Sequence, residues 1–178
     1  MKISHTHLAG VLIIEPTLHH DQRGHFKEIF NAQRYQELAG IQIPFVQVNQ
    51  SRSAKGVLRG MHFQKTRPQG KLITVNMGHI YDVVVDIQPT SDTYGQYLAV
   101  ELSDKNHRQL WVPPGYAHGF CVLSEIADIS YQCTEYYFPK DEAGLAWNCP
   151  EVNIMWPIEN PVLSSKDGSL PRLSSIAR

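Results

Sequence analysis

Three side chains that carry a charge or a titratable ring lie close together in one apolar stretch of this sequence. Arg59, His62 and Lys71 fall within thirteen residues, interleaved with apolar residues such as Leu58 and Phe63. Polar groups set among residues that favour a core are typical of a functional site. We interpret the stretch as one wall of a pocket inside a β-barrel, with His62 as the base and Lys71 as its electrostatic partner.

A histidine in a β-prone run is more often structural than catalytic, so the company of His62 matters. Other titratable residues share the faces of further expected strands: Asp82 with Asp86, Tyr131 with Cys133, Glu135 and Tyr137, and His118 after a Pro-rich turn. Burial on otherwise apolar strands can tune the pKa values of such groups.

Strict alternation along a strand places Arg59 and His62 on opposite faces. Both side chains can enter one pocket only if the strand is irregular between them. Gly60 is a natural position for a β-bulge. We therefore expect a bulge at Gly60.

Other chemistries are poorly supported. His62 is followed two residues later by Gln64 and not by a second His, and a pair with His118 gives too few ligands for a catalytic zinc site. No Gly-x-Ser-x-Gly elbow or Gly-rich phosphate loop is present. Side chains would then have to hold an anionic ligand, and the available cations are Arg23, Arg59, Lys71 and Lys166.

Composition limits the class of protein. The 178 residues have a formal net charge of −1, which does not favour a nucleic-acid or anionic-membrane partner. No run approaches the length of a membrane span, and the N-terminus lacks an apolar signal core. The odd cysteine count without metal-type spacing is typical of reduced thiols. We expect a cytoplasmic protein.

The pattern of the chain predicts an all-β domain. Strands are expected at 11–15, 25–30, 45–51, 56–64, 71–76, 79–87, 97–103, 108–112, 119–124 and 127–137. Many short strands separated by turn residues are typical of a sandwich or barrel. The one convincing helix covers 32–39, with Asn31 as its N-cap and Gly40 as its stop. Turns are expected at 20–24 and beyond Pro139, and residues 1–178 are expected to form one domain.

The motifs resemble those of the dTDP-4-dehydrorhamnose 3,5-epimerase family. The core of the resemblance is Arg59-Gly60-Met61-His62-Phe63-Gln64 followed by Gln69-Gly70-Lys71-Leu72. It continues in collinear order through 82–86, 91–95, 102–103, 114–120, 123–124 and 147–157, with 21–28 and 45–49 upstream and 163–167 downstream. The resemblance therefore covers nearly the whole chain.

The resemblance implies a cupin-type jelly roll with a few short helices that works as a homodimer, without a metal or other cofactor. It implies a nucleotide-linked 4-keto-6-deoxy sugar as the substrate, with protons removed from C3 and C5 and returned on the opposite face. The product would serve L-rhamnose synthesis, for example for O-antigen.

The resemblance also implies roles for residues. His62 would be the base, Asp167 the carboxylate that holds its tautomer, Lys71 the partner of the enolate oxygen, and Tyr131 the acid. The expected substrate-binding residues are Arg23, Phe26, Glu28, Gln47, Asn49, Arg59, Lys71, His118, Tyr137, Glu142 and Lys166. Phe26 and Glu28 would reach the pocket of the partner subunit.

Two departures from the family pattern stand out. Val48 replaces an acidic residue, and Gln50 stands where His is common. Alternation places Gln47 and Asn49 in the pocket and Val48 on the other side, in apolar packing or along an interface.

Three alternatives remain open. The first is an epimerase that inverts only C3 or only C5, and the second is a metal-dependent cupin enzyme. The third is a sugar-nucleotide-binding jelly roll without catalysis, which would not need both a base and an acid.

Overall fold

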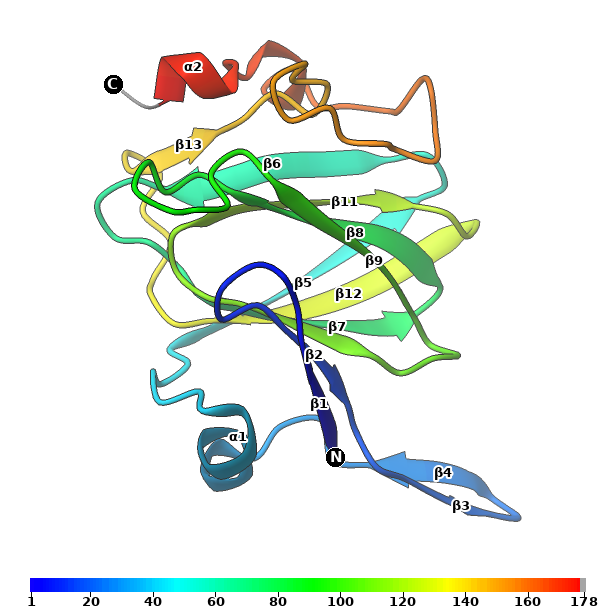
Figure 1. Ribbon diagram of the computed structural model, residues 1–178. Helices are drawn as coiled ribbons and strands as arrows, with labels where there is room; N and C mark the ends of the chain where they lie inside the picture. The colour runs from blue at the N-terminus through cyan, green and yellow to red at the C-terminus, as the bar shows by residue number, and fades with distance from the viewer. Residues whose placement is uncertain (177–178) are drawn as a thin grey trace.

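Two β-sheets packed face to face form the body of the protein (Figure 1). The computed structural model describes residues 1–176. The six-stranded sheet has the order β1 (Lys2–His5), β2 (Leu12–Glu15), β10 (Gln109–Val112), β7 (Lys71–Met77), β12 (Ile126–Cys133) and β5 (Gln47–Ala54). The five-stranded sheet has the order β13 (Glu142–Gly144), β6 (Leu58–Gln64), β11 (Tyr116–Val122), β8 (His79–Asp86) and β9 (Tyr97–Ser103).

The strand pairs are antiparallel, and the inward side chains of the two sheets form the main core. Ile73 and Ile129 come from the six-stranded sheet, and Ile80 and Val84 come from the five-stranded sheet. This arrangement of two antiparallel sheets confirms the predicted all-β jelly-roll class.

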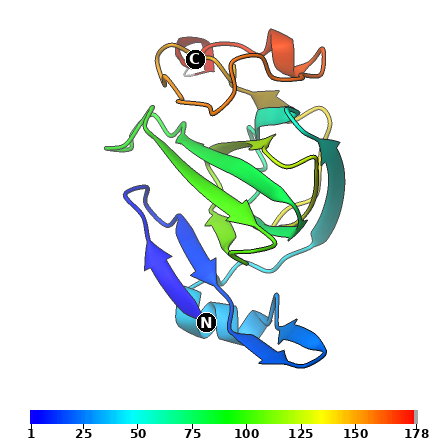
Figure 2. The ribbon, with the colours of Figure 1, turned by 90° about the vertical axis from the view of Figure 1, so that its right-hand side faces the viewer.

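Each sheet is also covered on part of its outer face. Helix α1 (Ala32–Ala39) buries Tyr35 against β2, β7 and β10 with Phe30 and Phe45 beside it. On the opposite side of the molecule, residues 145–176 cross the outer face of the five-stranded sheet (Figures 1 and 2). This C-terminal segment ends in a 3₁₀ turn (Asp167–Ser169) and α2 (Leu173–Ile176).

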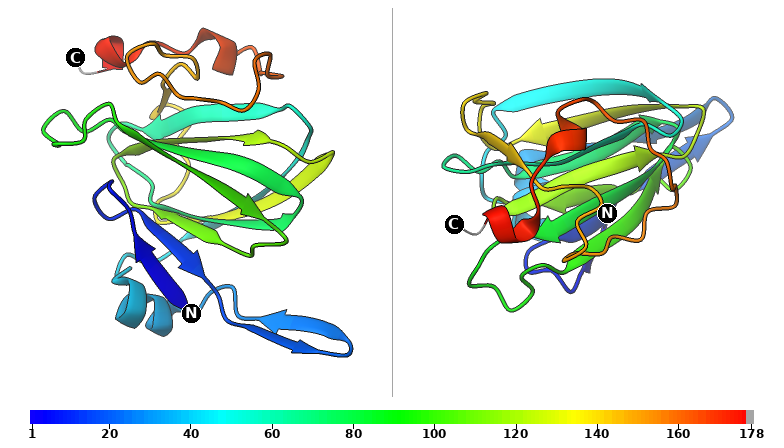
Figure 3. Two further views of the ribbon diagram at one scale, coloured as in Figure 1. Left: turned by 45° about the vertical axis from the view of Figure 1, so that its right-hand side comes forward. Right: turned by 90° about the horizontal axis from the view of Figure 1, so that it is seen from above.

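A third β-element projects away from the barrel. Strands β3 (Leu18–Asp21) and β4 (Gly24–Lys27) form a hairpin that extends sideways at the end occupied by α1 (Figures 1 and 3). Its turn is held by Asp21, which accepts a hydrogen bond from the Arg23 backbone N–H at 2.8 Å. The hairpin therefore lies far from the C-terminal segment.

Strand β6 is irregular where the sequence predicted it. His118 of β11 faces His62, whereas Phe120, two residues further along β11, faces Arg59 three residues back along β6. The extra residue confirms the predicted bulge at Gly60, and both Arg59 and His62 line the same cavity. The close approach of β6 and β11 requires glycine, because a Cβ at Gly60 would lie 2.6 Å from Gly119 Cα.

The local predictions succeed to different degrees. The helix at 32–39, the Asn31 N-cap and the Gly40 C-cap are confirmed, and so is the strand Tyr97–Ser103. The strand predicted at 25–30 ends at Lys27, and the strand β3 that precedes it was not predicted. Strands β1 and β13 were also missed.

One predicted strand is too long. Strand β12 ends at Cys133, so Glu135 and Tyr137 do not share a strand face with Tyr131. Backbone groups of the following loop bind side-chain amides in place of a neighbouring strand: the Phe138 N–H donates to Gln64 Oε1 at 2.7 Å. The side-chain amide of Gln64 in turn donates a hydrogen bond from Nε2 to the Tyr136 carbonyl at 3.1 Å.

Val48 corrects part of another prediction. Gln47 and Asn49 line a cavity, as alternation required. Val48 does point to the other side, but it is 67% exposed, so the prediction that it packs among apolar side chains of its own chain is wrong. The alternative of an interface stays a prediction.

No helix among residues 1–176 is long and apolar enough to cross a membrane.

We predict that Gly60→Ala destabilises the fold. Its φ of +124° lies in the region that side chains rarely adopt, and the added Cβ would also lie 2.9 Å from the His118 carbonyl oxygen. The expected loss in the free energy of unfolding, measured with urea, is about 1–3 kcal/mol. Gly168→Ala is the matched control, because apart from its own turn and chain neighbours no described atom lies within 4 Å of its Cβ position. Equal stability of the two variants would contradict the tight contact at Gly60.

Candidate active site

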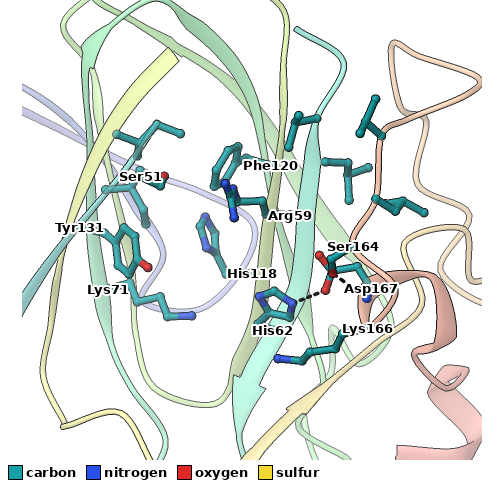
Figure 4. A pocket seen from close by; sticks show the side chains of 16 residues that line it. Ser51, Arg59, His62, Lys71, His118, Phe120, Tyr131, Ser164, Lys166 and Asp167 are labelled. Atoms are coloured by element: carbon teal, nitrogen blue, oxygen red, sulfur yellow. Dashed lines mark hydrogen bonds and ion pairs between the residues drawn. The ribbon is translucent and has the colours of Figure 1, made fainter. Parts of the chain in front are cut away.

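A cavity of about 450 Å³ lies between the two sheets, beside residues 162–167 of the C-terminal segment (Figure 4). Tyr131 and Lys71 project from the six-stranded sheet, whereas Arg59, His62 and His118 project from the five-stranded sheet. A second cavity of about 400 Å³ adjoins it and shares His62, Lys71 and Tyr131 in its lining. These three side chains therefore lie where the two cavities meet.

His62 is paired with a buried carboxylate. Its Nε2 lies 2.6 Å from Asp167 Oδ1, and Asp167 is only 4% exposed. With Nε2–H donating to Asp167, the unprotonated nitrogen is Nδ1. Burial lowers the pKa of His62, and the Asp167 hydrogen bond and charge partly oppose that shift. The geometry suits a neutral imidazole that accepts a proton at Nδ1.

Asp167 comes from far along the chain. It begins the 3₁₀ turn of the C-terminal segment, and its backbone N–H donates to Ser164 Oγ at 3.1 Å. Val162 forms a parallel bridge with Val57 just before β6. These contacts fix Asp167 beside the cavity, so it is not a solvated surface residue.

Lys71 is the enclosed cation of the site. Burial lowers the pKa of its ammonium group, while the charges of Cys133, Asp82 and Glu142 act in the opposite direction. Asp82 is fully buried, and its Oδ1 is hydrogen-bonded to His118 Nε2 at a distance of 2.8 Å. Burial raises the pKa of Asp82, and His118 and Lys71 counter that shift.

Tyr131 faces this group from β12. Burial raises the pKa of its phenol, with a further contribution from Cys133, and Arg59 and Asn49 oppose the shift. A raised pKa keeps the hydroxyl proton in place at neutral pH. Tyr131 is therefore suited to deliver a proton.

The side chain of Arg59 is oriented by a hydrogen bond to a serine. Its Nε donates to Ser53 Oγ at 2.9 Å, and among the described residues no carboxylate lies within ion-pair distance of its guanidinium. Its two terminal nitrogens can therefore meet an anionic ligand in the bidentate manner that suits phosphate or carboxylate.

The second cavity holds most of the remaining predicted binding residues. Glu142 accepts a hydrogen bond from Tyr137 Oη at 2.7 Å and forms an ion pair with Lys166. Burial tends to raise the pKa of Glu142, but its bonds to Lys166 and Tyr137 leave it lowered. Gln47 accepts from the Tyr137 backbone N–H at 2.9 Å and donates to Asn49 Oδ1 at 3.0 Å. Gln47 thus positions Tyr137 within this cavity.

Three predicted binding residues do not join either cavity in one chain. Arg23 lies in the hairpin turn and bonds Asp21. Phe26 is 70% exposed, and Glu28 pairs with Arg34 at 3.1 Å. Phe26 and Glu28 instead line a separate cavity of about 230 Å³ at the N-terminal end of the molecule.

Several cavity residues were missed. Ser51 and Phe120 line the main cavity, as does Ser164. Extending the alternation of Gln47 and Asn49 by one step along β5 would have found Ser51. Ser164 could not be found this way, because it belongs to an irregular segment.

No group of three or more His, Cys, Asp or Glu side chains within residues 1–176 is arranged to hold a metal ion.

The comparisons with known proteins agree on one family. The family model described as dTDP-4-dehydrorhamnose 3,5-epimerase matches residues 5–175. The chain belongs to this family. It is accordingly an isomerase, as the sequence predicted.

Among curated relatives, the dTDP-4-dehydrorhamnose 3,5-epimerase of Methanothermobacter thermautotrophicus is 47% identical over 165 residues, 91% of this chain and 89% of the relative. A crystal structure of dTDP-6-deoxy-D-glucose-3,5-epimerase from Legionella pneumophila, in complex with dTDP-4-keto-L-rhamnose, is 48% identical with a TM-score of 0.95. It covers 98% of this chain and 94% of that one.

A more distant family member acts differently. A 3′-monoepimerase from Streptomyces bikiniensis, solved in complex with dTDP-quinovose, is 31% identical with a TM-score of 0.87. The match covers 93% of this chain and 84% of that chain. The same fold therefore accommodates single-centre epimerases.

We predict that Asp167→Asn weakens the base and moves its titration. Removing the charge that raises the pKa of His62 lets burial lower it further, so the acid limb of kcat/KM should shift to lower pH. The plateau should fall by as much as about 10²–10⁴-fold, the range that general-base catalysis contributes. A pH–rate profile measures both effects.

Glu125→Gln serves as the control, because Glu125 is an exposed carboxylate paired with Lys55. Its profile should match that of the unmodified enzyme. An Asp167→Asn enzyme with an unshifted acid limb would show that Asp167 does not control the titration of His62.

Proposed function

We propose that this chain inverts C3 and C5 of dTDP-4-dehydro-6-deoxy-D-glucose to give dTDP-4-dehydro-L-rhamnose. The observation that carries the proposal is the placement of a base and an acid on opposite walls of one cavity, with an ammonium group between them. Inverting a carbon centre requires a proton to leave one face and another to arrive on the opposite face. The relatives named for this reaction support the same conclusion.

The first step is removal of a proton next to the C4 ketone. His62 Nδ1 takes the proton, and the electron pair of the C–H bond moves toward the carbonyl to give an enolate. Asp167 accepts the Nε2–H and stabilises the imidazolium that forms. The lowered pKa of His62 keeps the ring neutral, and so able to act as a base, at neutral pH.

The enolate oxygen needs a positive partner. Lys71 lies between His62 and Tyr131 in the lining of both cavities, so its ammonium group can meet the charge that develops on O4. Because the enclosed site limits solvent screening, that interaction is stronger than it would be in water.

The second step returns a proton from the other side. Tyr131 Oη transfers its proton to the carbon while the enolate collapses to the ketone. Since Tyr131 is on β12 and His62 on β6, the proton arrives on the face opposite to the one that lost it. The imidazolium of His62 then releases its proton to solvent, and the Tyr131 phenolate takes a proton from solvent. Repeating the cycle at the second carbon inverts both centres.

The remaining predicted residues are proposed to hold the substrate. Arg59 and Lys166 carry charges that match a diphosphate, and Tyr137 offers an exposed ring for stacking on a base. His118, held by Asp82, and the Gln47–Asn49 pair present polar groups to the sugar end. The family name supports a dTDP-linked substrate.

The alternative is a single-centre epimerase. It is favoured by the 3′-monoepimerase from Streptomyces bikiniensis, which shares the fold. The higher identity to relatives named 3,5-epimerases supports inversion of both centres in this chain.

We also propose that residues 1–178 act as one domain in a cytoplasmic homodimer. The three cysteines are free and buried, in keeping with a reducing compartment. Strands β1 and β5 lie at the two open edges of the six-stranded sheet, where contact with a second copy would cover them. In such a dimer Arg23, Phe26 and Glu28, which do not join the cavities of their own chain, would serve the partner's nucleotide site.

We predict that the two reaction halves can be separated in deuterated water. In His62→Ala, the rate of deuterium incorporation at both C3 and C5 should fall about 10²–10⁴-fold. Tyr131→Phe should still incorporate deuterium but invert little, because the proton returns from His62 to the original face. NMR of the sugar reports both outcomes.

Tyr136→Phe is the control, since Tyr136 is an exposed tyrosine in the loop after β12. It should exchange and invert normally. Rapid exchange in His62→Ala would remove His62 from the mechanism, and full inversion by Tyr131→Phe would assign the acid to another group.

We predict that Val48→Asp weakens self-association. Val48 is 67% exposed on the edge strand β5, so an interface that covers it would bury the new carboxylate. The dimer dissociation constant, measured by sedimentation equilibrium, should rise about tenfold or more. Met155→Asp, at a side chain that is 69% exposed on the C-terminal segment, is the matched control. A fully active monomer would contradict the homodimer.

A further inference from the structure

One row of polar side chains on β5 points into the barrel. Gln47, Asn49, Ser51 and Ser53 alternate with outward residues along the strand. Three of the four have protein partners: Gln47 and Asn49 bond each other at 3.0 Å, and Ser53 receives Arg59 at 2.9 Å. Ser51 differs from its neighbours.

Ser51 Oγ is buried without a hydrogen-bond partner. Within residues 1–176 it is the one buried side-chain nitrogen or oxygen of which this is true. The lining of this cavity also includes the apolar side chains of Ile73, Phe120 and Ile129. Figure 4 shows Ser51 beside Tyr131 on the same wall. A buried hydroxyl left without a partner is destabilising, and Ser51 lines a cavity in which a ligand can supply that partner.

We propose that Ser51 is a specificity-determining residue that hydrogen-bonds the C2 hydroxyl of the sugar. The inference rests on the proposed function, because it assigns an atom of that substrate. A serine hydroxyl both donates and accepts, which matches another hydroxyl.

The reaction itself selects the C2 hydroxyl. The proposed sugar has a ketone at C4, a methyl group at C6 and free hydroxyls only at C2 and C3. Inversion at C3 moves the C3 hydroxyl from one side of the ring to the other. The C2 hydroxyl keeps its configuration, so a side chain fixed on a strand can hold it in substrate and product alike.

The strand register agrees with this assignment. Along β12, Cys133 pairs with Lys71, Tyr131 pairs with Asn49, and Ile129 pairs with Ser51. Ser51 and Lys71 thus flank Tyr131 on opposite sides. With Lys71 at O4, Ser51 faces the part of the ring remote from C4, where the C2 hydroxyl is the free hydroxyl group.

The test compares two enzymes on two substrates. Ser51→Ala and the unmodified enzyme are assayed with the proposed substrate and with its 2-deoxy analogue. Ser51→Ala should lower kcat/KM for the proposed substrate about 10-fold, mainly through KM. The unmodified enzyme should lose a similar factor on the analogue, and Ser51→Ala should lose nothing further there. This non-additivity is the signature of a direct bond.

Ser130→Ala on β12 is the matched control, because Ser130 lies outside both cavities and bonds Asn76. It should leave both substrates unaffected. Urea unfolding of Ser51→Ala should show no loss of stability, since Ser51 Oγ has no protein bond to lose.

Two results would overturn the inference while leaving the proposed function intact. One is an unchanged kcat/KM of Ser51→Ala on the proposed substrate, and the other is an equal loss on both substrates. Absence of turnover by the unmodified enzyme on the proposed substrate would overturn both proposals together.

Discussion

The close contact between Gly60 and Gly119 is the constraint on which the site depends. Without a Cβ on either residue, β6 and β11 can approach closely enough for β6 to carry one extra residue. That residue changes the alternation, so that Arg59 and His62 face the same cavity. A regular strand would send either Arg59 or His62 to the outer face, and the two side chains would no longer share a cavity.

The site also requires a carboxylate beside His62, and the packing of a segment far along the chain supplies it. Asp167 lies 105 residues after His62, and it reaches the imidazole because the C-terminal segment packs on the outer face of the five-stranded sheet. Apolar residues such as Leu145 and Leu173 are buried there. Because that segment also contributes Val162 and Ser164 to the cavity wall, its packing supports the wall and the orientation of the base at once.

Features with local causes were predictable from the sequence. The N-cap and C-cap residues of helix 32–39 directly flank it in the sequence. The bulge in β6 was predicted because strict alternation would have placed Arg59 and His62 on opposite faces of the strand, whereas a shared pocket requires both on one face. The end of β12 was not predictable, because it depends on amides of Gln47, Gln64 and Gln69 that bind the loop after Cys133. Ser51 was not predicted as a site residue, although the alternation of Gln47 and Asn49 along β5 extends to it. The missing hydrogen-bond partner of its hydroxyl can be recognised only when the surrounding structure is known.

A two-sheet fold suits this chemistry for a geometric reason. Each wall of the cavity comes from a different sheet, and the period of two along the strands, shifted once at Gly60, gives each wall a fixed row of inward side chains. His62 on one sheet and Tyr131 on the other are therefore held apart by the packing of the whole core. An acid and a base that must act on opposite faces of one ring need this separation more than they need mobility. In the proposed mechanism Lys71, enclosed between them, meets the enolate without rearrangement of the site.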